Sequence, residues 1–332
     1  EKRKNGEPIV TKVEVTPSRF SRLAKMYNQM SPKNQNIVKS IIANPDIIQQ
    51  PIYANLSEKA KAKVTDSLIN YYAFKKLQEP EEKKYNDLRI KMIKQRFLIS
   101  EKSGFESIDF SQAKPPHGSQ NSFGLKFTNA FSDTLDPFEE LSIRPALYDE
   151  LNPTVGRQNN TSLVVWDTTL RYSDNKLSLN RLDFFRVSTL NTPSTDLPDV
   201  GSMSWKVQLS LKAPTQICDD CTVLHFSGGV GFSRGLLPGL DVYGLAKLGV
   251  QENYKGLGTV YIGPEVGAYI EPFPWWKMLL SYELESFQNG LEADTDIWKF
   301  EHRFGESKSW DARLEYFQRD DKQLRLSFGW YL

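Results

Sequence analysis

Histidines are the residues of this chain best suited to acid–base chemistry, and the sequence has three of them: His117, His225 and His302. A hydrolase needs a nucleophile beside a base, and a third group must orient that base. Ser227 lies two residues after His225 and so shares its face of an extended segment. No third group is evident for either His225 or His302, so we expect no catalytic site and keep these two histidines as weak candidates.

The two cysteines, Cys218 and Cys221, are separated by two residues. In a reducing compartment this spacing would suggest a redox site or half of a zinc site. The sequence contains no second cysteine pair, so the spacing favours a disulfide that pins a loop between two strands. No metal-ligand spacing, phosphate loop or nucleophile elbow occurs, and we expect neither a metal nor a cofactor.

Charged residues of both signs recur at alternate positions in the last two thirds of the chain. Such spacing places them on one face of each extended segment, and we expect them to pair with one another inside an enclosed space. A selective pore would show a ring of one sign, whereas mixed signs favour a closed, ion-paired interior. The predicted network comprises Arg144, Asp167, Arg171, Lys206, Glu283, Glu285, Arg313, Glu315 and Arg325.

The elements that carry these residues fall into two parts that differ in charge and period. Residues 1–102 hold 21 Lys and Arg against 11 Asp and Glu, a net charge of +10, and the remainder carries −9. Apolar residues recur at helical spacing in the first part, with Ser31 and Ser57 as predicted caps. We expect helices over about 16–27, 32–43, 57–77 and 80–99. The basic residues are interpreted as solvated helix faces, and no nucleic acid is expected as a partner.

From residue 121 the period changes from 3.6 to 2. The segment 103–120 contains Gly, Pro and Ser and is interpreted as a linker. Most of the predicted strands are about 10 to 14 residues long, and a transmembrane strand needs about 9 to 11. The twelve candidate strands are 121–130, 137–148, 161–172, 176–188, 201–213, 221–233, 239–251, 257–270, 274–287, 294–304, 308–319 and 322–332.

The last strand gives the strongest indication of the environment. Leu324, Leu326, Phe328, Trp330 and Leu332 fall on one face of it, and polar residues fall on the other. An open edge of this kind invites aggregation, whereas a strand that closes a membrane barrel has no open edge. Tryptophans near strand ends are typical of the girdles of such barrels. The predicted girdle comprises Trp166, Trp205, Trp276, Trp310 and Trp330.

We therefore predict a mainly β protein: an antiparallel transmembrane β-barrel of about 12 strands over 121–332, preceded by a small α-helical periplasmic domain over 1–102. A soluble sandwich or barrel with its apolar face inside is the alternative. No apolar run approaches the roughly 18 residues of a membrane helix. An even strand count places the helical domain and the C-terminus on the periplasmic side. The long connections 149–160 and 189–200 would then lie on that side too, against the usual preference for short periplasmic turns.

Several motifs resemble the C-terminal half of the uncharacterised family of Lnb N-terminal periplasmic domain-containing proteins. They are Pro116-His117-Gly118-Ser119, the run from Leu141 to Pro153, Leu179-Asn180-Arg181-Leu182-Asp183-Phe184, Ser204-Trp205-Lys206-Val207, and the Cys218…Cys221 pair followed by Gly228-Gly229-Val230-Gly231. The resemblance implies a helical region plus an outer-membrane barrel. It also implies an upstream Lnb-type domain with Cys/His chemistry, which this chain lacks, so any acyltransferase-like activity would lie outside it.

These observations predict a barrel in the bacterial outer membrane that anchors a periplasmic domain. The expected partners are the lipid bilayer with its lipopolysaccharide, a periplasmic catalytic domain, and lipoproteins. A narrow channel or transporter is the first alternative, and a barrel hydrolase acting on lipid or peptide is the second. The chain opens on Glu1-Lys2-Arg3-Lys4 without a signal peptide, so we expect it to be part of a longer protein.

Overall fold

The chain forms two compact units. The computed structural model describes residues 16, 18–102, 105, 119–153, 157, 159–190, 195–198, 203–213, 221–253, 259–288, 294–305 and 308–332. One unit comprises Glu1–Ala113 together with Ser194–Gly201, and is termed the helical unit. The other comprises Lys114–Pro193 and Ser202–Leu332, and is termed the barrel unit.

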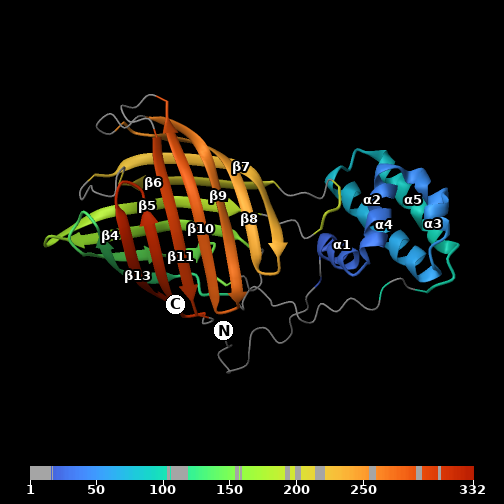
Figure 1. Ribbon diagram of the computed structural model, residues 1–332, viewed down its shortest axis with the longest axis horizontal. Coiled ribbons are helices and arrows are strands. Elements are labelled where there is room, and N and C mark those ends of the chain that lie inside the picture. The colour runs from blue at the N-terminus through green and yellow to red at the C-terminus, as the bar shows by residue number, and fades with distance from the viewer. Residues whose placement is uncertain are drawn as a thin grey trace, which may run out of the picture. The chain divides into compact units, whose positions relative to one another are not determined.

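Five α-helices and one 3-10 helix make up the described part of the helical unit (Figure 1). Serine side chains cap three of them, because Ser18, Ser31 and Ser57 each accept a hydrogen bond from a backbone N–H of the first turn. The four predicted helices are therefore confirmed, and two short ones join them. The elements are α1 (Arg19–Asn28), α2 (Pro32–Ala43), η1 (Pro45–Gln49), α3 (Pro51–Ala54), α4 (Glu58–Gln78) and α5 (Lys83–Phe97).

A single apolar core holds the helices together. Leu23, Ile41, Leu68 and Met92 are fully buried in it, each from a different helix. Leu197, which lies far along the chain, is buried in the same core. No helix among the described residues is both long and apolar enough to cross a membrane.

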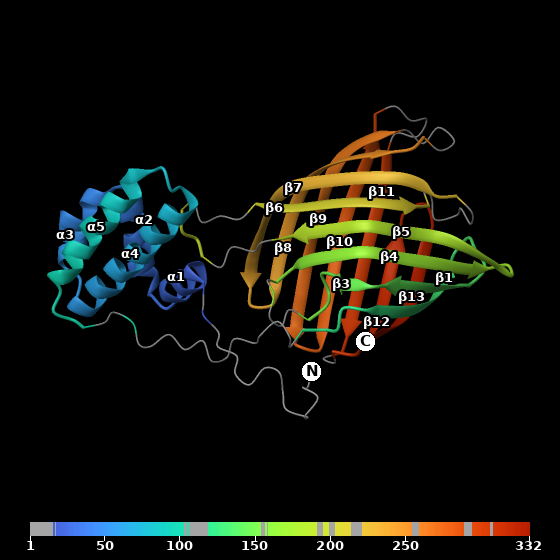
Figure 2. The ribbon, with the colours of Figure 1, turned by 180° about the vertical axis from the view of Figure 1, so that it is seen from behind.

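The barrel unit is a closed antiparallel sheet of twelve strands, as predicted. Strand β1 pairs with both β2 and β13, and β2 also pairs with β4, which closes the ring (Figure 2). The strand segments are β1 (Gly124–Ser132), β2 (Phe138–Arg144), β3 (Ala146–Tyr148), β4 (Thr161–Ser173), β5 (Lys176–Thr189), β6 (Ser204–Lys212), β7 (Val223–Leu237), β8 (Leu240–Gln251), β9 (Val260–Phe273), β10 (Trp276–Phe287), β11 (Asp294–Phe304), β12 (Trp310–Gln318) and β13 (Lys322–Tyr331).

Strands β2 and β3 form one interrupted strand. Both pair with β4, and Pro145 separates them. Proline has no N–H to donate to a ladder, so it breaks the hydrogen bonding at that point. The thirteen strand segments therefore make twelve barrel strands, and the predicted strand 137–148 corresponds to β2 and β3 together.

The two faces of the barrel have opposite polarity. In β13, Leu324, Leu326, Phe328 and Trp330 are between 44% and 52% exposed, whereas Tyr331 is 4% exposed. The apolar side chains thus point outward and the polar ones point into the barrel. This is the polarity of a transmembrane barrel, and the soluble alternative, with the apolar face inside, is wrong.

The two ends of the barrel differ in their connections. The end at which β1 begins and β13 ends is termed the near end, and the opposite end the far end. At the far end, Asp174 and Asn175 join β4 to β5 with φ values of 48° and 60°, as a two-residue type I′ turn requires. Both long connections, 149–160 and 190–203, lie at the near end because of the strand directions. Each has a structural role, described below, that accounts for its length.

Candidate functional site

The barrel interior carries a dense set of ion pairs and is the candidate functional site. The structure places the predicted network residues on the inner side of the strands. Arg144, Arg171, Glu285 and Arg313 are buried there, and Asp167 and Glu315 line an interior cavity. The remaining predicted members, Lys206, Glu283 and Arg325, each form an ion pair with another inward-pointing side chain.

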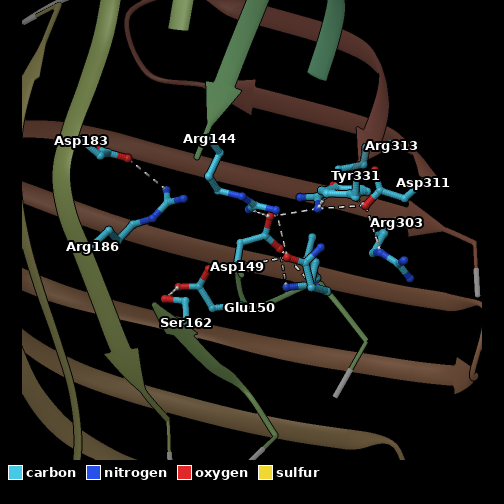
Figure 3. Close-up of polar contacts among 12 residues, drawn as sticks. Arg144, Asp149, Glu150, Ser162, Asp183, Arg186, Arg303, Asp311, Arg313 and Tyr331 are labelled. Atoms are coloured by element: carbon cyan, nitrogen blue, oxygen red, sulfur yellow. Dashed lines mark hydrogen bonds and ion pairs between the residues drawn. The ribbon is translucent and has the colours of Figure 1, made fainter. Parts of the chain in front are cut away.

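Asp149 is the centre of the first cluster, at the near end. Its Oδ2 atom accepts hydrogen bonds from Arg144 at 3.0 Å and from Arg313 at 2.9 Å. Arg313 also donates to Glu301 at 3.1 Å and to Asp311 at 3.0 Å. Figure 3 shows the dashed lines from Asp149 to both arginines. Two cations share this carboxylate, which offsets the cost of burying all three charges.

The connection that carries Asp149 folds into the barrel. Backbone N–H groups of Leu151 and Asn152 donate to Asp149 Oδ1 at 3.0 and 3.1 Å, which closes a tight turn. Arg157 donates to the carbonyl oxygens of Pro153, Thr161, Asp149 and Asn152, and so holds the connection together. These bonds leave the described part of 149–160 as an internal plug instead of a surface loop.

Two further contacts fix the plug to the barrel wall. Glu150 accepts hydrogen bonds from Ser162 and Ser188, both at 3.0 Å, and Lys277 donates to its backbone carbonyl at 2.8 Å. Leu151 packs into a small apolar cluster inside the barrel with Leu190, Tyr243, Leu245, Tyr269 and Leu279. The length of this near-end connection is therefore explained by its position in the lumen.

A second cluster joins strands β6, β8, β9 and β10. Lys206 pairs with Glu265 at 2.5 Å, and Lys247 pairs with Glu265 at 3.2 Å and with Glu283. Tyr243 donates to Glu265 at 2.8 Å. These ion pairs span one to three strands across the wall, because Lys247 on β8 reaches β9 and β10 and Lys206 on β6 reaches β9.

A third group lies toward the far end. Glu140 contacts Arg171 at 3.4 Å, Asn180 at 2.8 Å and Arg325 at 3.7 Å. Arg319 pairs with Glu285 at 2.8 Å. Ion pairs thus occur from the near end to the far end of the described interior.

Some members of the network escaped sequence reasoning. Glu140, Lys247 and Glu265 alternate with exposed residues in their strands, so the period-2 pattern could have identified them. Asp149 follows the end of β3 and belongs to no strand pattern. Only the folded barrel brings it to Arg313, 164 positions away.

The described interior contains two small cavities. One has a volume of about 150 Å³, and seven acidic and seven basic residues line it. The other has a volume of about 200 Å³ and is lined by three acidic and five basic residues. Small-molecule sites typically enclose about 300–1,000 Å³, so each cavity is below that range. Charged side chains of the wall and of the plug therefore occupy much of the described interior around these cavities.

The histidine candidates occupy different surroundings. His225 is 2% exposed, points inward, and its Nε2 atom lies 3.0 Å from the hydroxyl of Tyr261. His302 points outward, accepts a hydrogen bond from Trp276 Nε1 at 3.1 Å, and stacks on Trp276 and Phe304. Neither arrangement joins a nucleophile to an oriented base, so the geometry does not favour catalysis. His117 lies outside the described residues.

Four of the five predicted girdle tryptophans lie at the near end. Trp276 and Trp310 begin their strands, Trp205 is the second residue of β6, and Trp330 is the penultimate residue of β13. Trp166 is 53% exposed but lies within β4, away from the strand ends, with a φ of 60° in the left-handed region. The tryptophan belt is therefore concentrated at one end of the barrel.

Neither a cofactor site nor a metal site is indicated where the chain can be described. No group of three or more His, Cys, Asp and Glu side chains in the described ranges is arranged to hold a metal ion. Cys221 lies just before β7, and Cys218 falls outside the described residues. The disulfide between them stays a prediction.

Comparison with known proteins gives one family. No curated protein matches the sequence. Similar solved structures include the KdgM porin in complex with disordered oligogalacturonate, at 8% identity and a TM-score of 0.38, covering 63% of this chain and 99% of that chain. The NanC porin has 9% identity and a TM-score of 0.39, covering 64% and 100%. The Acinetobacter baumannii outer membrane protein Omp33 has 10% identity and a TM-score of 0.34, covering 65% and 100%.

At these identities and TM-scores, the likeness supports no inference about what this chain binds or transports. A family model described as Domain of unknown function (DUF7840) matches residues 114–331, a range that contains the barrel unit except its last residue together with Ser194–Gly201 of the helical unit. Because that match spans more than half of the 332 residues, the chain belongs to the DUF7840 family.

Proposed function

We propose that the chain is an outer-membrane barrel with a closed interior, which serves as a scaffold that holds its helical unit at the periplasmic face. The apolar outer face and the charged inner face support a position in the membrane. The filled lumen supports a scaffold in preference to an open pore.

The observation that carries this proposal is the origin of one part of the helical unit. Residues 195–198 lie between β5 and β6 in sequence, yet they belong to the helical unit. Leu197 is 5% exposed in the helical core, and Tyr71 donates to the carbonyl of Pro198 at 3.1 Å. The chain therefore connects the two units at two places: before β1, and within the β5–β6 connection. A double connection suits an anchor.

The segment 195–198 is termed the strap, and Asp196 binds it to the helices. Asp196 accepts hydrogen bonds from Tyr27 at 2.5 Å and from Lys39 at 2.7 Å. The hydrogen bond from Lys39, together with that from Tyr27, lowers the pKa of Asp196 below its ordinary value. Burial and the bond to Asp196 raise the pKa of Tyr27, so the pair stays a neutral phenol and a carboxylate near neutral pH.

The periplasmic orientation is supported by strand parity. Twelve strands bring the start of β1 and the end of β13 to the same end of the barrel. If that end faces the periplasm, the helical unit is periplasmic as well. On the sequence resemblance, the scaffold also holds an Lnb-type domain upstream of the helical unit. Lipoproteins or other envelope components are the partners of that domain.

Conductance is the test of a closed scaffold. The purified chain, reconstituted in planar bilayers, should give no more current than a protein-free bilayer, because the plug and the ion pairs fill the lumen. Barrel insertion is verified in the same preparation by the heat-dependent shift of the folded band on a gel. A reproducible, ion-selective conductance of the unmodified chain would contradict the scaffold and favour a channel.

A narrow channel is the second candidate, and the two interior cavities favour it. Under that alternative, the plug is a gate held by Asp149. The substitution Asp149→Ala removes the shared partner of Arg144 and Arg313. Breaking a buried ion pair lowers the free energy of unfolding by about 3–5 kcal/mol. If Asp149→Ala conducts and the matched control Asp174→Asn in an exposed turn does not, a path through the barrel exists once the plug is released.

A further inference from the structure

Helix α5 has an unusual solvent-facing stripe. Its positions recur at spacings of four and three residues, so they fall on one side of the helix. The opposite side packs on the helical core through Met92, which is fully buried. The stripe comprises Lys83, Asp87, Ile90, Lys91, Lys94, Phe97 and Leu98.

Large apolar side chains are exposed along this stripe. Phe97 is 83% exposed, Leu98 is 77% exposed and Ile90 is 43% exposed. Beside them lies an open groove of about 500 Å³, in which Ile48 and Leu98 line the wall together with Lys91 and Lys94. Exposed apolar side chains that gather beside a groove in this way are typical of interaction surfaces.

The helical unit as a whole is positively charged, while Asp87 also lines the groove and Asp46 pairs with Lys91 at 3.0 Å. The described residues of the helical unit include 17 Lys and Arg and 9 Asp and Glu. On the stripe itself, three lysines accompany one aspartate. Lysines can lay their methylene chains along apolar surface while the ammonium groups reach outward to anions.

We propose that this face of α5 docks on the anionic phospholipid surface of the membrane in which the barrel is inserted. Phe97 and Leu98 would enter the headgroup region, and Lys83 and Lys94 would contact the phosphates, since Lys91 already pairs with Asp46. Interfacial helices combine apolar side chains with lysines in this way. An acidic protein segment would match the charge too, but it would not call for two protruding neighbours with such high exposure.

The proposal rests on the membrane location given above, and the chain supplies the proximity. The helical unit is joined to the barrel unit on both sides of the strap as well as before β1. Insertion of the barrel therefore keeps this face at a high effective concentration near a bilayer. Weak contacts are sufficient under these conditions.

The experiment follows the surroundings of residue 97 in the full chain. The variant Phe97→Cys is labelled with the fluorophore NBD and reconstituted in nanodiscs of phosphatidylcholine, or of an equimolar mixture with phosphatidylglycerol. We expect the emission to shift to the blue in the anionic nanodiscs only. Leu77→Cys is the matched control, since Leu77 is an exposed apolar residue, 61% exposed, at the end of α4. The unsubstituted chain, labelled in parallel, gives the background.

Charge variants test the role of the lysines. Each lysine near an anionic surface contributes about fivefold to binding, so K83Q/K94Q should lower the equilibrium constant for docking about 25-fold. The control K33Q/K59Q removes the same charge from other helices and should leave the constant within a few-fold. Added salt should weaken docking as well, because it screens exposed charges.

Each outcome decides between the proposals. An inserted barrel whose residue-97 probe stays in water overturns the docking proposal and leaves the scaffold intact. Equal shifts in both kinds of nanodisc, or equal losses in the two lysine pairs, overturn the anionic specificity. If the probe instead shifts to the blue in lipid-free detergent micelles when an acidic protein is added, this face of α5 binds a protein partner. A chain that fails to insert contradicts both proposals, and the gel shift identifies that case.

Discussion

Leu197 offers a sharp test of the strap, because its position in the sequence and its position in the fold give opposite expectations. It lies between β5 and β6, within the stretch that forms the barrel. The structure nevertheless buries it in the helical core, with 5% of its surface exposed. The substitution Leu197→Ala should therefore destabilise the helical unit and spare the barrel.

The expected magnitude follows from its burial. Truncation of a buried leucine to alanine costs about 2–5 kcal/mol, depending on how far the cavity collapses. In a unit of about 100 residues, each kcal/mol lowers the melting temperature by roughly 4–8 °C. Even the lower limit of the cost predicts a fall of about 8 °C or more for the helices.

The chain provides two independent signals for this assay. All seven tryptophans lie in the barrel unit, so tryptophan fluorescence reports on the barrel alone. Ellipticity at 222 nm is dominated by the helices, which belong to the described part of the helical unit. Thermal scans of the full chain in detergent micelles, recorded with both signals, separate the two transitions.

Leu190 is the matched control for Leu197. It belongs to the same β5–β6 connection and is 1% exposed, but it packs in the apolar cluster of the barrel interior. Leu190→Ala should lower the fluorescence transition and leave the helical transition unchanged, the reverse of Leu197→Ala. If Leu197→Ala moves the fluorescence transition and not the ellipticity, the strap is not part of the helical core and the reasoning is refuted.

Three further predictions concern the barrel wall and the strap. Leu326→Arg, on the outer face near mid-membrane, should lower the free energy of unfolding of the barrel by about 2–4 kcal/mol, and Leu332→Arg at the end of the barrel by about 0–1 kcal/mol. Both are measured by the folded fraction in liposomes, and equal costs would contradict the assigned membrane face. A Cβ at Gly263 would lie 1.7 Å from a backbone oxygen of the next strand, whereas one at Gly228 would lie 3.6 Å from its nearest atom. Gly263→Ala should therefore lower the melting temperature of the barrel, read by tryptophan fluorescence, and Gly228→Ala should not. Because the pKa of Asp196 is lowered in the folded chain, its stabilisation is full above the ordinary aspartate pKa of about 3.9 and is lost as the pH falls through the folded value. The difference in helical melting between the parent chain and Asp196→Asn should therefore shrink on acidification, and a difference that stays constant would argue against this ion pair.

Much of the fold could be predicted because its signals are local. Period-2 alternation identified the twelve strands, including the one that Pro145 interrupts, and the serines at positions 31 and 57 identified helix starts. The polarity of β13 identified which face meets lipid. In each case the pattern repeats within one element, so a single stretch of sequence contains the information.

The interior could be predicted only in part. Alternation placed Arg313 and Lys206 on the inner face, but it gave no partners for them. Lys206 on β6 reaches Glu265 on β9, three strands away, and Arg313 reaches Asp149 in a connection. Such pairs depend on the stagger of strands around a closed ring, which no single strand records.

The sequence by itself determined that the chain has a basic helical part and a barrel with a charged inside and an apolar outside, because burial preference and backbone period act on each element separately. Tertiary structure alone decided that one near-end connection fills the lumen and that the other completes the helical core. Leu151 and Leu197 both lie in long and mainly polar connections, yet one packs against barrel tyrosines and the other against helices. The physical reason is that a loop residue has no periodic neighbours to fix its direction, so only the surfaces that the folded elements offer can determine where it is buried.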